Sequence, residues 1–325
     1  MAPTVETDQI PIFVLGITPR SGTNFLHRLL CQHPDVGSVT KTAAKEDFLV
    51  HHAHHIREYI RSVAWQWSHW GDESDLADAL TKSLGRGIQH FLASRVENSF
   101  IALKTPSVRG IEHFFDLFPE AYLIVIVRDG RSVVASGMSG FSWDFETATR
   151  RWANAARTIL RFRKQSPPHN EQCRIIRYED LNENTLDEYY SLLDFVGLQS
   201  DGFDVEDAID LPIYGSSFAS KSEGQVSWQP VEKTRDFSST QRWETWDKER
   251  HERFNWLAGD ELEALGYALQ GSSRSDLAHV TINTAYDLAY ASQHWPRLLL
   301  QSARQGLSAM RGHVKLNRHS HLKKK

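Results

Sequence analysis

Short apolar runs alternate with longer amphipathic segments along the chain, and this alternation predicts the fold class. Apolar runs of strand length lie at 12–16, 99–104, 122–127 and 174–178, and a shorter one follows a turn near 34–38. Helical spacing is found at 25–30, 46–70, about 75–95, 107–117 and 144–163, and in a segment that starts near 130. An acidic break, Glu179–Asp180, follows the last strand. This order predicts an α/β fold with a parallel central sheet flanked by helices, whose ligands bind at the carboxyl ends of the strands.

The first strand leads into a turn of small residues and then into a helix N-terminus, an arrangement that binds anions. First-turn N–H groups have no partner within the helix, and the helix dipole adds positive charge there. Gly22 lets the backbone close on an anion, and Arg20 supplies a cation. Ser21, Thr23 and Asn24 add side-chain donors. The sequence therefore predicts a phosphate- or sulfate-binding loop here.

This loop differs from that of the nucleotide triphosphatases, which requires a Gly, four residues and then Gly-Lys-Ser/Thr. Gly16 and Gly22 enclose five residues, and Thr23 stands where the Lys is required. The cation instead precedes the second glycine, at Arg20. Such a loop suits an anion that is already activated for transfer, while an ordinary turn with a fortuitous Arg is the alternative.

Length and composition predict one large domain with two appendages. The chain has 325 residues, of which 40% are hydrophobic, enough for a full core. We expect a polar N-terminal arm at 1–9, an α/β domain at 10–270 and a basic helical C-terminal extension at 271–325. No apolar run is long enough to span a bilayer, so we expect a cytoplasmic protein. Cys31 and Cys173 are not at zinc-site spacing, and neither a disulfide framework nor a metal is expected.

The net charge of -4 conceals a basic C-terminal tail. No Asp or Glu follows Asp287, and the acidic body argues against nucleic-acid binding. Apolar residues recur in the tail at helical spacing, which favours docking on the body or self-association over peripheral contact with an anionic membrane. The apolar positions are Leu299, Ala303, Leu307, Met310 and Val314, and the basic ones are Arg297, Arg304, Arg311, Lys315, Arg318 and Lys323–Lys325.

The segment 41–70 concentrates histidine and tryptophan. Histidines at this density invite a metal interpretation, but without an adjoining carboxylate–histidine ligand set a polar surface is favoured. The tryptophans can form the floor of an acceptor pocket or belong to a core or an interface. These residues are His51, His52, His54 and His55, and Trp65, Trp67 and Trp70.

Four separated motifs resemble, in order, those of the sulfotransferases that use 3′-phosphoadenosine-5′-phosphosulfate (PAPS). They are Thr18-Pro19-Arg20-Ser21-Gly22-Thr23, Leu103-Lys104-Thr105-Pro106, Val127-Arg128-Asp129-Gly130-Arg131 with Ser136, and, more loosely, Arg177-Tyr178-Glu179-Asp180-Leu181. The resemblance is closest to the branch with protein-tyrosine and carbohydrate sulfotransferases, and extends over about Ile10 to Leu269, because Trp243, Trp246 and Leu265-Gly266-Tyr267 are similar to the end of the family domain.

The resemblance implies a role for each motif. The first would be a P-loop-like loop that holds the 5′-phosphosulfate, with Arg20 on the bridging oxygen. Lys104 would stabilise the sulfuryl group, Arg128 and Ser136 would grip the 3′-phosphate, and Tyr178 would lie near the adenine. Cations and N–H groups are what such a transfer needs, because charge builds up on the equatorial oxygens and the leaving phosphate.

The general base departs from the family pattern. By spacing from Arg20 the family's Glu would fall near Lys41, which cannot serve as a carboxylate. Glu46 is the candidate, since a carboxylate in a closed cleft has a raised pKa, while a solvated helix residue is the alternative. His51 and His52 are further candidates, because the pKa of imidazole is near neutrality.

The sequence therefore predicts an enzyme that moves a sulfuryl group from PAPS, without a metal, to a hydroxyl or amine. The acceptor would be a small molecule, a carbohydrate or a lipid. A nucleotide-dependent kinase is disfavoured by the missing Lys of the triphosphatase loop. A non-enzymatic nucleotide- or anion-binding protein stays open because of Lys41.

Overall fold

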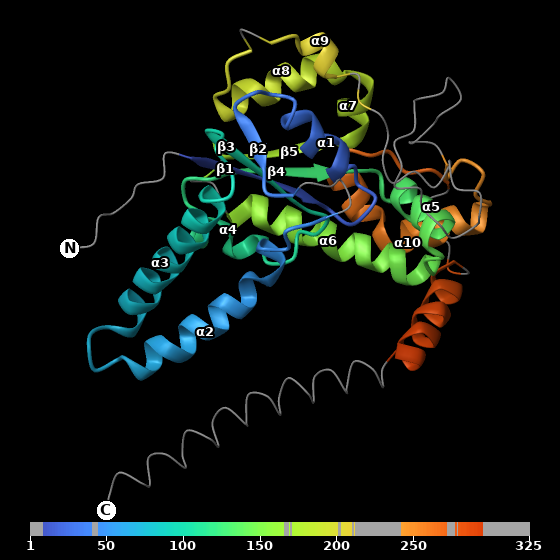
Figure 1. Ribbon diagram of the computed structural model, residues 1–325. Coiled ribbons are helices and arrows are strands. Elements are labelled where there is room, and N and C mark those ends of the chain that lie inside the picture. Colours follow the sequence, from blue (N-terminus) through green and yellow to red (C-terminus); the bar gives the residue numbers. More distant parts are fainter. Residues whose placement is uncertain are drawn as a thin grey trace, which may run out of the picture.

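A computed structural model describes residues 9–40, 45–165, 169, 171–200, 203–209, 211, 242–271, 277 and 279–294 (Figure 1). The strands are β1 (Ile10–Gly16), β2 (Val36–Ser38), β3 (Phe100–Thr105), β4 (Tyr122–Val127) and β5 (Cys173–Arg177). The helices are α1 (Thr23–Leu30), α2 (Ala53–Gln66), α3 (Glu73–Ala93), α4 (Phe114–Leu117), α5 (Gly130–Phe141), α6 (Phe145–Gln165), α7 (Tyr178–Glu183), α8 (Thr185–Val196), α9 (Val205–Ala208) and α10 (Lys248–Ala264). Short 3₁₀ helices are η1 (Val50–His52) and η2 (Ile111–His113), and residues 279–294 form a further helix.

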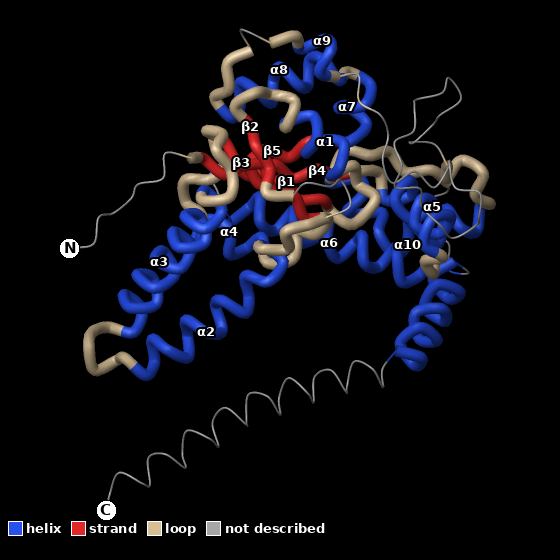
Figure 2. The backbone as a smooth tube through the Cα atoms, viewed as in Figure 1, coloured by secondary structure: helices blue, strands red, loops and turns tan. Residues whose placement is uncertain are grey.

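The strands form one parallel sheet, as the sequence predicted, and their order in the sheet is β2-β3-β1-β4-β5 (Figure 2). The register pairs Val14 of β1 with Lys104 of β3 on one side and with Ile124 of β4 on the other. All carboxyl ends consequently meet at the same edge of the sheet. This edge brings together the ends of β1, β3, β4 and β5, where the candidate residues were expected.

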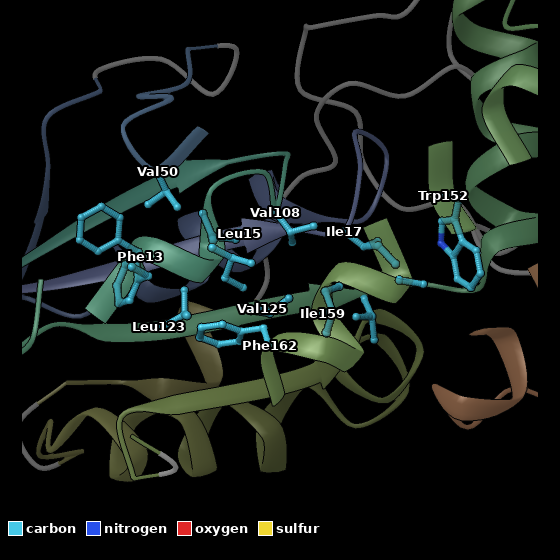
Figure 3. Close-up of a cluster of buried hydrophobic side chains, with 14 of the residues drawn as sticks. Phe13, Leu15, Ile17, Val50, Val108, Leu123, Val125, Trp152, Ile159 and Phe162 are labelled. Carbon is cyan, nitrogen blue, oxygen red and sulfur yellow. The ribbon is translucent and has the colours of Figure 1, made fainter. Parts of the chain in front are cut away.

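Alternate side chains of the central strand β1 point to opposite faces of the sheet. Phe13 and Leu15 pack into one apolar cluster with residues of α4, α6 and α10 (Figure 3). Ile12 and Val14 pack into a second cluster with residues of α1 and α8. A strand buried on both faces reads as a continuous apolar run, which is why the sequence identified it.

Two predicted helices are shorter in the structure because the backbone is needed for other contacts. The helix expected at 107–117 is reduced to η2 and α4, since Gly110 has a φ of 83° and lies against the carbonyl of Val50. The helix expected at 46–70 begins only at η1, because Phe48 has a φ of 55° and its N–H donates to Thr105 Oγ1. Tertiary contacts therefore override helical spacing at both sites.

The predicted acidic break after the last strand was wrong. Glu179 and Asp180 lie in the first turn of α7, which starts directly after β5. Carboxylates are stabilised there by the helix dipole, so acidic residues at this position favour a helix start.

The appendages are only partly described. The arm at 1–8 and the apolar tail positions from Leu299 onward lie outside the described residues. None of the helices among the described residues has the length and apolar character needed to cross a membrane.

A prediction on stability follows from the contact between α3 and α4. A Cβ on Gly85 would lie 1.8 Å from the carbonyl oxygen of Leu117, whereas a Cβ on Gly87 would meet nothing within 4 Å. We expect Gly85→Ala to lower the free energy of unfolding by about 1–3 kcal/mol through overpacking. Gly87→Ala, the matched control, should be neutral or raise it by up to about 1 kcal/mol. Denaturant unfolding measures both, and equal effects of the two substitutions would contradict the contact.

Candidate active site

The loop between β1 and α1 is closed by its own polar groups. The Ser21 hydroxyl donates to the Thr18 carbonyl at 2.5 Å and accepts from the Thr18 N–H at 3.2 Å. Ser21 is fully buried, so its side chain shapes the loop. Gly22, the N-cap of α1, has a φ of 98° and provides no side chain to cap the helix. The N-terminus of α1 therefore has no side-chain cap, which is the arrangement that the predicted anion-binding loop requires.

Gly22 also allows an aromatic ring to close on the loop. A Cβ on Gly22 would lie 2.3 Å from the ring of Tyr178, the first residue of α7. The guanidinium of Arg128 also contacts this ring, with its Cζ 4.6 Å from the centre of the Tyr178 ring. The structure therefore brings the loop together with the ends of β4 and β5.

Two arginines converge beside the loop. Arg20 Nε donates to the hydroxyl of Ser136 at 3.0 Å, and Arg128 Nη1 donates to the Arg20 carbonyl at 2.6 Å. Burial and the neighbouring Arg128 and Arg242 lower the pKa of Arg20 to about 10. Positive charge of this density, in a buried position, fits a multiply charged anion.

Arg242 was not identified from the sequence. Its pKa is lowered by burial and by the charge of Arg128, which places it in the same cluster. Its neighbour Trp243 was noted for its resemblance to the end of the family domain, and its ring stacks on Arg131 with the guanidinium 3.8 Å from the ring centre. Arg242 was missed because it follows no predicted strand and belongs to none of the motifs.

Lys104 lies at the centre of a second polar group. Its side chain is 1% exposed, its ammonium donates to Asn24 Oδ1, and Glu46 Oε1 lies 3.5 Å from its Nζ. Burial lowers the pKa of Lys104 and raises the pKa of Glu46 to about 7, although Lys104 itself acts to lower the latter. Among the described residues, no group hydrogen-bonds to the buried Oε2 of Glu46. A carboxylate with a pKa raised in this way can accept a proton near neutral pH.

The segment that carries Glu46 is fixed to the end of β3. The Asp47 N–H donates to the Lys104 carbonyl at 3.2 Å, and Thr105 Oγ1 donates to Asp47 Oδ1 at 3.2 Å. Phe48 completes the contact through its N–H. A structured loop thus holds Glu46, in place of the solvated helix residue considered from the sequence.

The end of β4 is held by a separate set of carboxylates. Asp129 caps α5 and pairs with Arg131 at 2.6 Å. Glu179 accepts from the Asp129 N–H at 3.0 Å and from the Tyr267 hydroxyl at 2.8 Å. These contacts tie the segment after α10 to the ends of β4 and β5.

The histidines and tryptophans of 51–70 lie on η1, on α2 and just after α2, beyond the segment that carries Glu46. His51 Nδ1 lies 2.9 Å from Ser107 Oγ, and no group of three metal-ligating side chains occurs in the described part of the chain. Trp67 and Trp70 stack at 4.7 Å where α2 turns into α3, at the far end of the hairpin in Figure 1. Lys41 lies outside the described residues.

A family model described as the sulfotransferase family matches residues 11–202, which include every motif named above except the C-terminal one. The chain belongs to the sulfotransferase family. Protein-tyrosine sulfotransferase 1 of Danio rerio is 25% identical over 197 residues, 55% of this chain and 51% of that protein. The Homo sapiens protein of the same name is 25% identical over 168 residues, 46% of this chain and 42% of that protein. The chain thus spans about half the length of the curated relatives it matches.

Solved structures of sulfotransferases are similar at low identity. The sulfotransferase domain of the Synechococcus PCC 7002 olefin synthase has a TM-score of 0.48 at 18% identity, covering 88% of this chain and 98% of that chain. Mouse sulfotransferase SULT7A1, complexed with PAP, has a TM-score of 0.44 at 11% identity, covering 86% of this chain and 89% of that chain. These relatives are remote.

A prediction on proton affinity follows from the buried pair. We expect the Glu46 carboxyl to titrate near pH 7, against an ordinary value of 4.5, as measured by infrared or NMR titration of the labelled side chain. Lys104→Met should raise the pKa of Glu46 further, because it removes the cation that stabilises the carboxylate. Exposed Glu58, on α2, serves as an internal control for the titration. A Glu46 midpoint near 4.5, or one lowered by Lys104→Met, would contradict this account.

Proposed function

We propose that this member of the sulfotransferase family moves a sulfuryl group from PAPS to a hydroxyl or amine of an acceptor. The observation that carries the proposal is the pair of Lys104 and Glu46 at 3.5 Å, buried beside an anion-binding helix N-terminus. Membership of the family and the PAP-bound mouse relative support the choice of donor. The acceptor that we propose is a small molecule, a carbohydrate or a lipid.

The residues of the donor side fit a nucleotide with two phosphate positions. The open N-terminus of α1 and Arg20 would hold the 5′ end, and Arg128 with Ser136 the 3′-phosphate. Tyr178 would lie against the base. Since Arg20 contacts both Ser136 and the loop, one side chain connects the two phosphate positions. PAPS, when bound, supplies the sulfuryl group to be transferred.

The acceptor side acts through proton transfer and charge. Glu46 would accept the proton of the acceptor hydroxyl, which its raised pKa favours near neutral pH. Lys104 would stabilise the negative charge that develops on the oxygens, and Asn24 holds its ammonium in place. No metal is required for these roles, because the cations are side chains.

Calorimetry separates this proposal from the kinase and from simple anion binding. PAP should bind to the full chain without Mg²⁺ and more tightly than ATP with Mg²⁺, because Thr23 stands where a triphosphatase loop has its Lys. Preference for ATP with Mg²⁺ would refute the proposal. PAP binding without turnover of PAPS over a broad acceptor set would leave a nucleotide-binding protein instead.

A prediction on donor identity follows from Arg128. Arg128→Ala should weaken binding of PAP by about 1.5–3 kcal/mol, the value of a charge-assisted hydrogen bond, and weaken 5′-AMP far less. Comparing two nucleotides on one variant removes any general effect on the site. Equal weakening of both would refute the assignment to the 3′-phosphate.

A prediction on the base follows from Glu46. Glu46→Gln should lower turnover roughly 10²–10⁴-fold with nearly unchanged affinity for PAP. In the unsubstituted protein, the rate should rise with pH and level off above the Glu46 pKa of about 7, because a base acts when deprotonated. Glu58→Gln, on the exposed surface of α2, is the matched control and should change neither the turnover nor its dependence on pH. Near-normal turnover of Glu46→Gln would pass the role to His51 or His52.

A further inference from the structure

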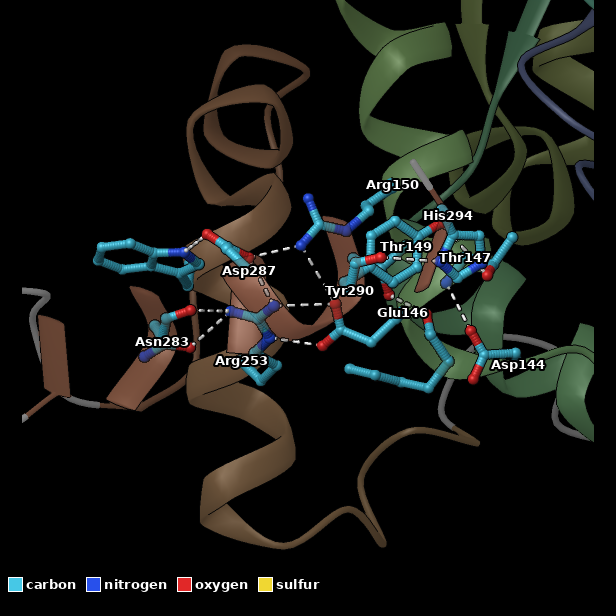
Figure 4. Close-up of polar contacts among 12 residues, drawn as sticks. Asp144, Glu146, Thr147, Thr149, Arg150, Arg253, Asn283, Asp287, Tyr290 and His294 are labelled. Carbon is cyan, nitrogen blue, oxygen red and sulfur yellow. Dashed lines mark hydrogen bonds and ion pairs between the residues drawn. The ribbon is translucent and has the colours of Figure 1, made fainter. Parts of the chain in front are cut away.

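The helix at 279–294 packs on the body through polar side chains. Asn283 is buried, and every half-buried residue of this helix is polar. Their partners lie on α6 and α10 (Figure 4). The inward residues are His279, Asn283, Asp287, Tyr290 and His294.

The contacts of this inner face form a dense network around Arg253. Its guanidinium contacts Asp287 Oδ1 at 2.7 Å and Asn283 Oδ1 at 3.0 Å on the helix, and Glu146 Oε1 at 2.5 Å on α6. Arg150 also pairs with Asp287 at 2.5 Å. Side chains that are partly buried and bonded on several sides hold the helix in one orientation.

The outer face of the helix is uncharged and carries large apolar side chains among exposed threonine, alanine, serine and glutamine residues. Ile282 is 54% exposed, Tyr286 59% and Leu288 68%, and Leu277 and Val280 are also exposed. Asp287 is the one formally charged side chain among the described residues 279–294, and it is engaged by Arg253 and Arg150. A surface helix ordinarily places its apolar face on the core and its charges in water. This helix has the reverse arrangement, which indicates that its outer face is covered by something apolar.

The charge of the sequence after this helix indicates what kind of surface covers the apolar face. No carboxylate occurs after Asp287, while basic residues recur from Arg297 to Lys325. In a symmetric pair, a second copy would bring an equally basic segment to the same contact, and the two would repel. An anionic lipid surface instead attracts basic residues and accepts an apolar helix face.

We propose that the outer face of helix 279–294 lies on an anionic membrane surface, with the basic C-terminal sequence against the lipid headgroups. The sequence alone favoured docking or self-association for the tail. Docking of this helix on the body is already achieved by its polar face, so the apolar face is left for another surface. The α2–α3 turn, with exposed Trp65 and Trp70, lies on the same lower side of the molecule in Figure 1 and offers aromatic side chains suited to a membrane interface.

Vesicle co-sedimentation of the full chain tests this proposal independently of sulfuryl transfer. The protein should bind vesicles of phosphatidylserine and phosphatidylcholine, bind pure phosphatidylcholine weakly, and dissociate as salt is raised. The double variant Ile282→Glu with Leu288→Glu should bind the anionic vesicles roughly tenfold less or weaker still, because two apolar anchors become charged. Both positions are exposed, so folding should persist, as unfolding curves will verify.

A matched control is Tyr190→Glu, a similarly exposed position on α8 across the molecule, which should bind as the unsubstituted chain does. Failure of the unsubstituted chain to bind anionic vesicles would overturn the proposal. A dimer in solution that the double variant abolishes, without vesicle binding, would show that a second copy covers the face. Equal loss of binding in the double variant and in Tyr190→Glu would also contradict it.

Discussion

The site depends on one lysine and one carboxylate that are kept buried together at the end of a parallel sheet. Removing either charge from water is unfavourable, and burial raises the pKa of Glu46 while it lowers that of Lys104. The pair persists because each partner offsets the other's charge and Asn24 accepts from the lysine. Asn24 belongs to α1, Lys104 to β3 and Glu46 to the segment before η1, so one interaction joins three distant parts of the chain. A carboxylate in this setting is poised to exchange a proton at neutral pH.

The arginine cluster differs from this pair, because it gathers charges of one sign. The charge of Arg128 lowers the pKa of both Arg20 and Arg242, and a bound anion would offset this repulsion. The backbone after Arg128 is held by hydrogen bonds, because Asp129 caps α5 and Glu179 links that turn to Tyr267. The arginine cluster and the buried pair are linked by the chain between β1 and α1. Arg20 in the loop donates to Ser136 beside the other arginines, and Asn24 in the first turn of α1 accepts from Lys104. The fold thus places a cluster of arginines close to a buried lysine–carboxylate pair.

Much of the fold could be predicted from the sequence, because the patterns that mark its strands lie within short stretches of the chain. Strands buried on both faces appear as apolar runs, so β1 and β4 were found with the basic residues at their ends. Glu46 was named as the base, but its contact with Lys104 arises only when β3 and the segment before η1 are brought together. Arg242 and the link from Glu179 to Tyr267 were missed because they join residues far apart in sequence without any pattern. The helix expected at 107–117 failed where Gly110 meets the Val50 carbonyl, a tertiary contact that helical spacing cannot reveal.

The central claim is that this edge of the sheet transfers a sulfuryl group, and it is tested most directly by following the group itself. The full chain can be incubated with PAPS labelled in the sulfuryl sulfur and an extract of small molecules, carbohydrates and lipids, with separation of the labelled products. The account predicts that label appears on an acceptor hydroxyl or amine while PAP forms in equal amount. Label that stays on the nucleotide, or that is released only as inorganic sulfate, would contradict it.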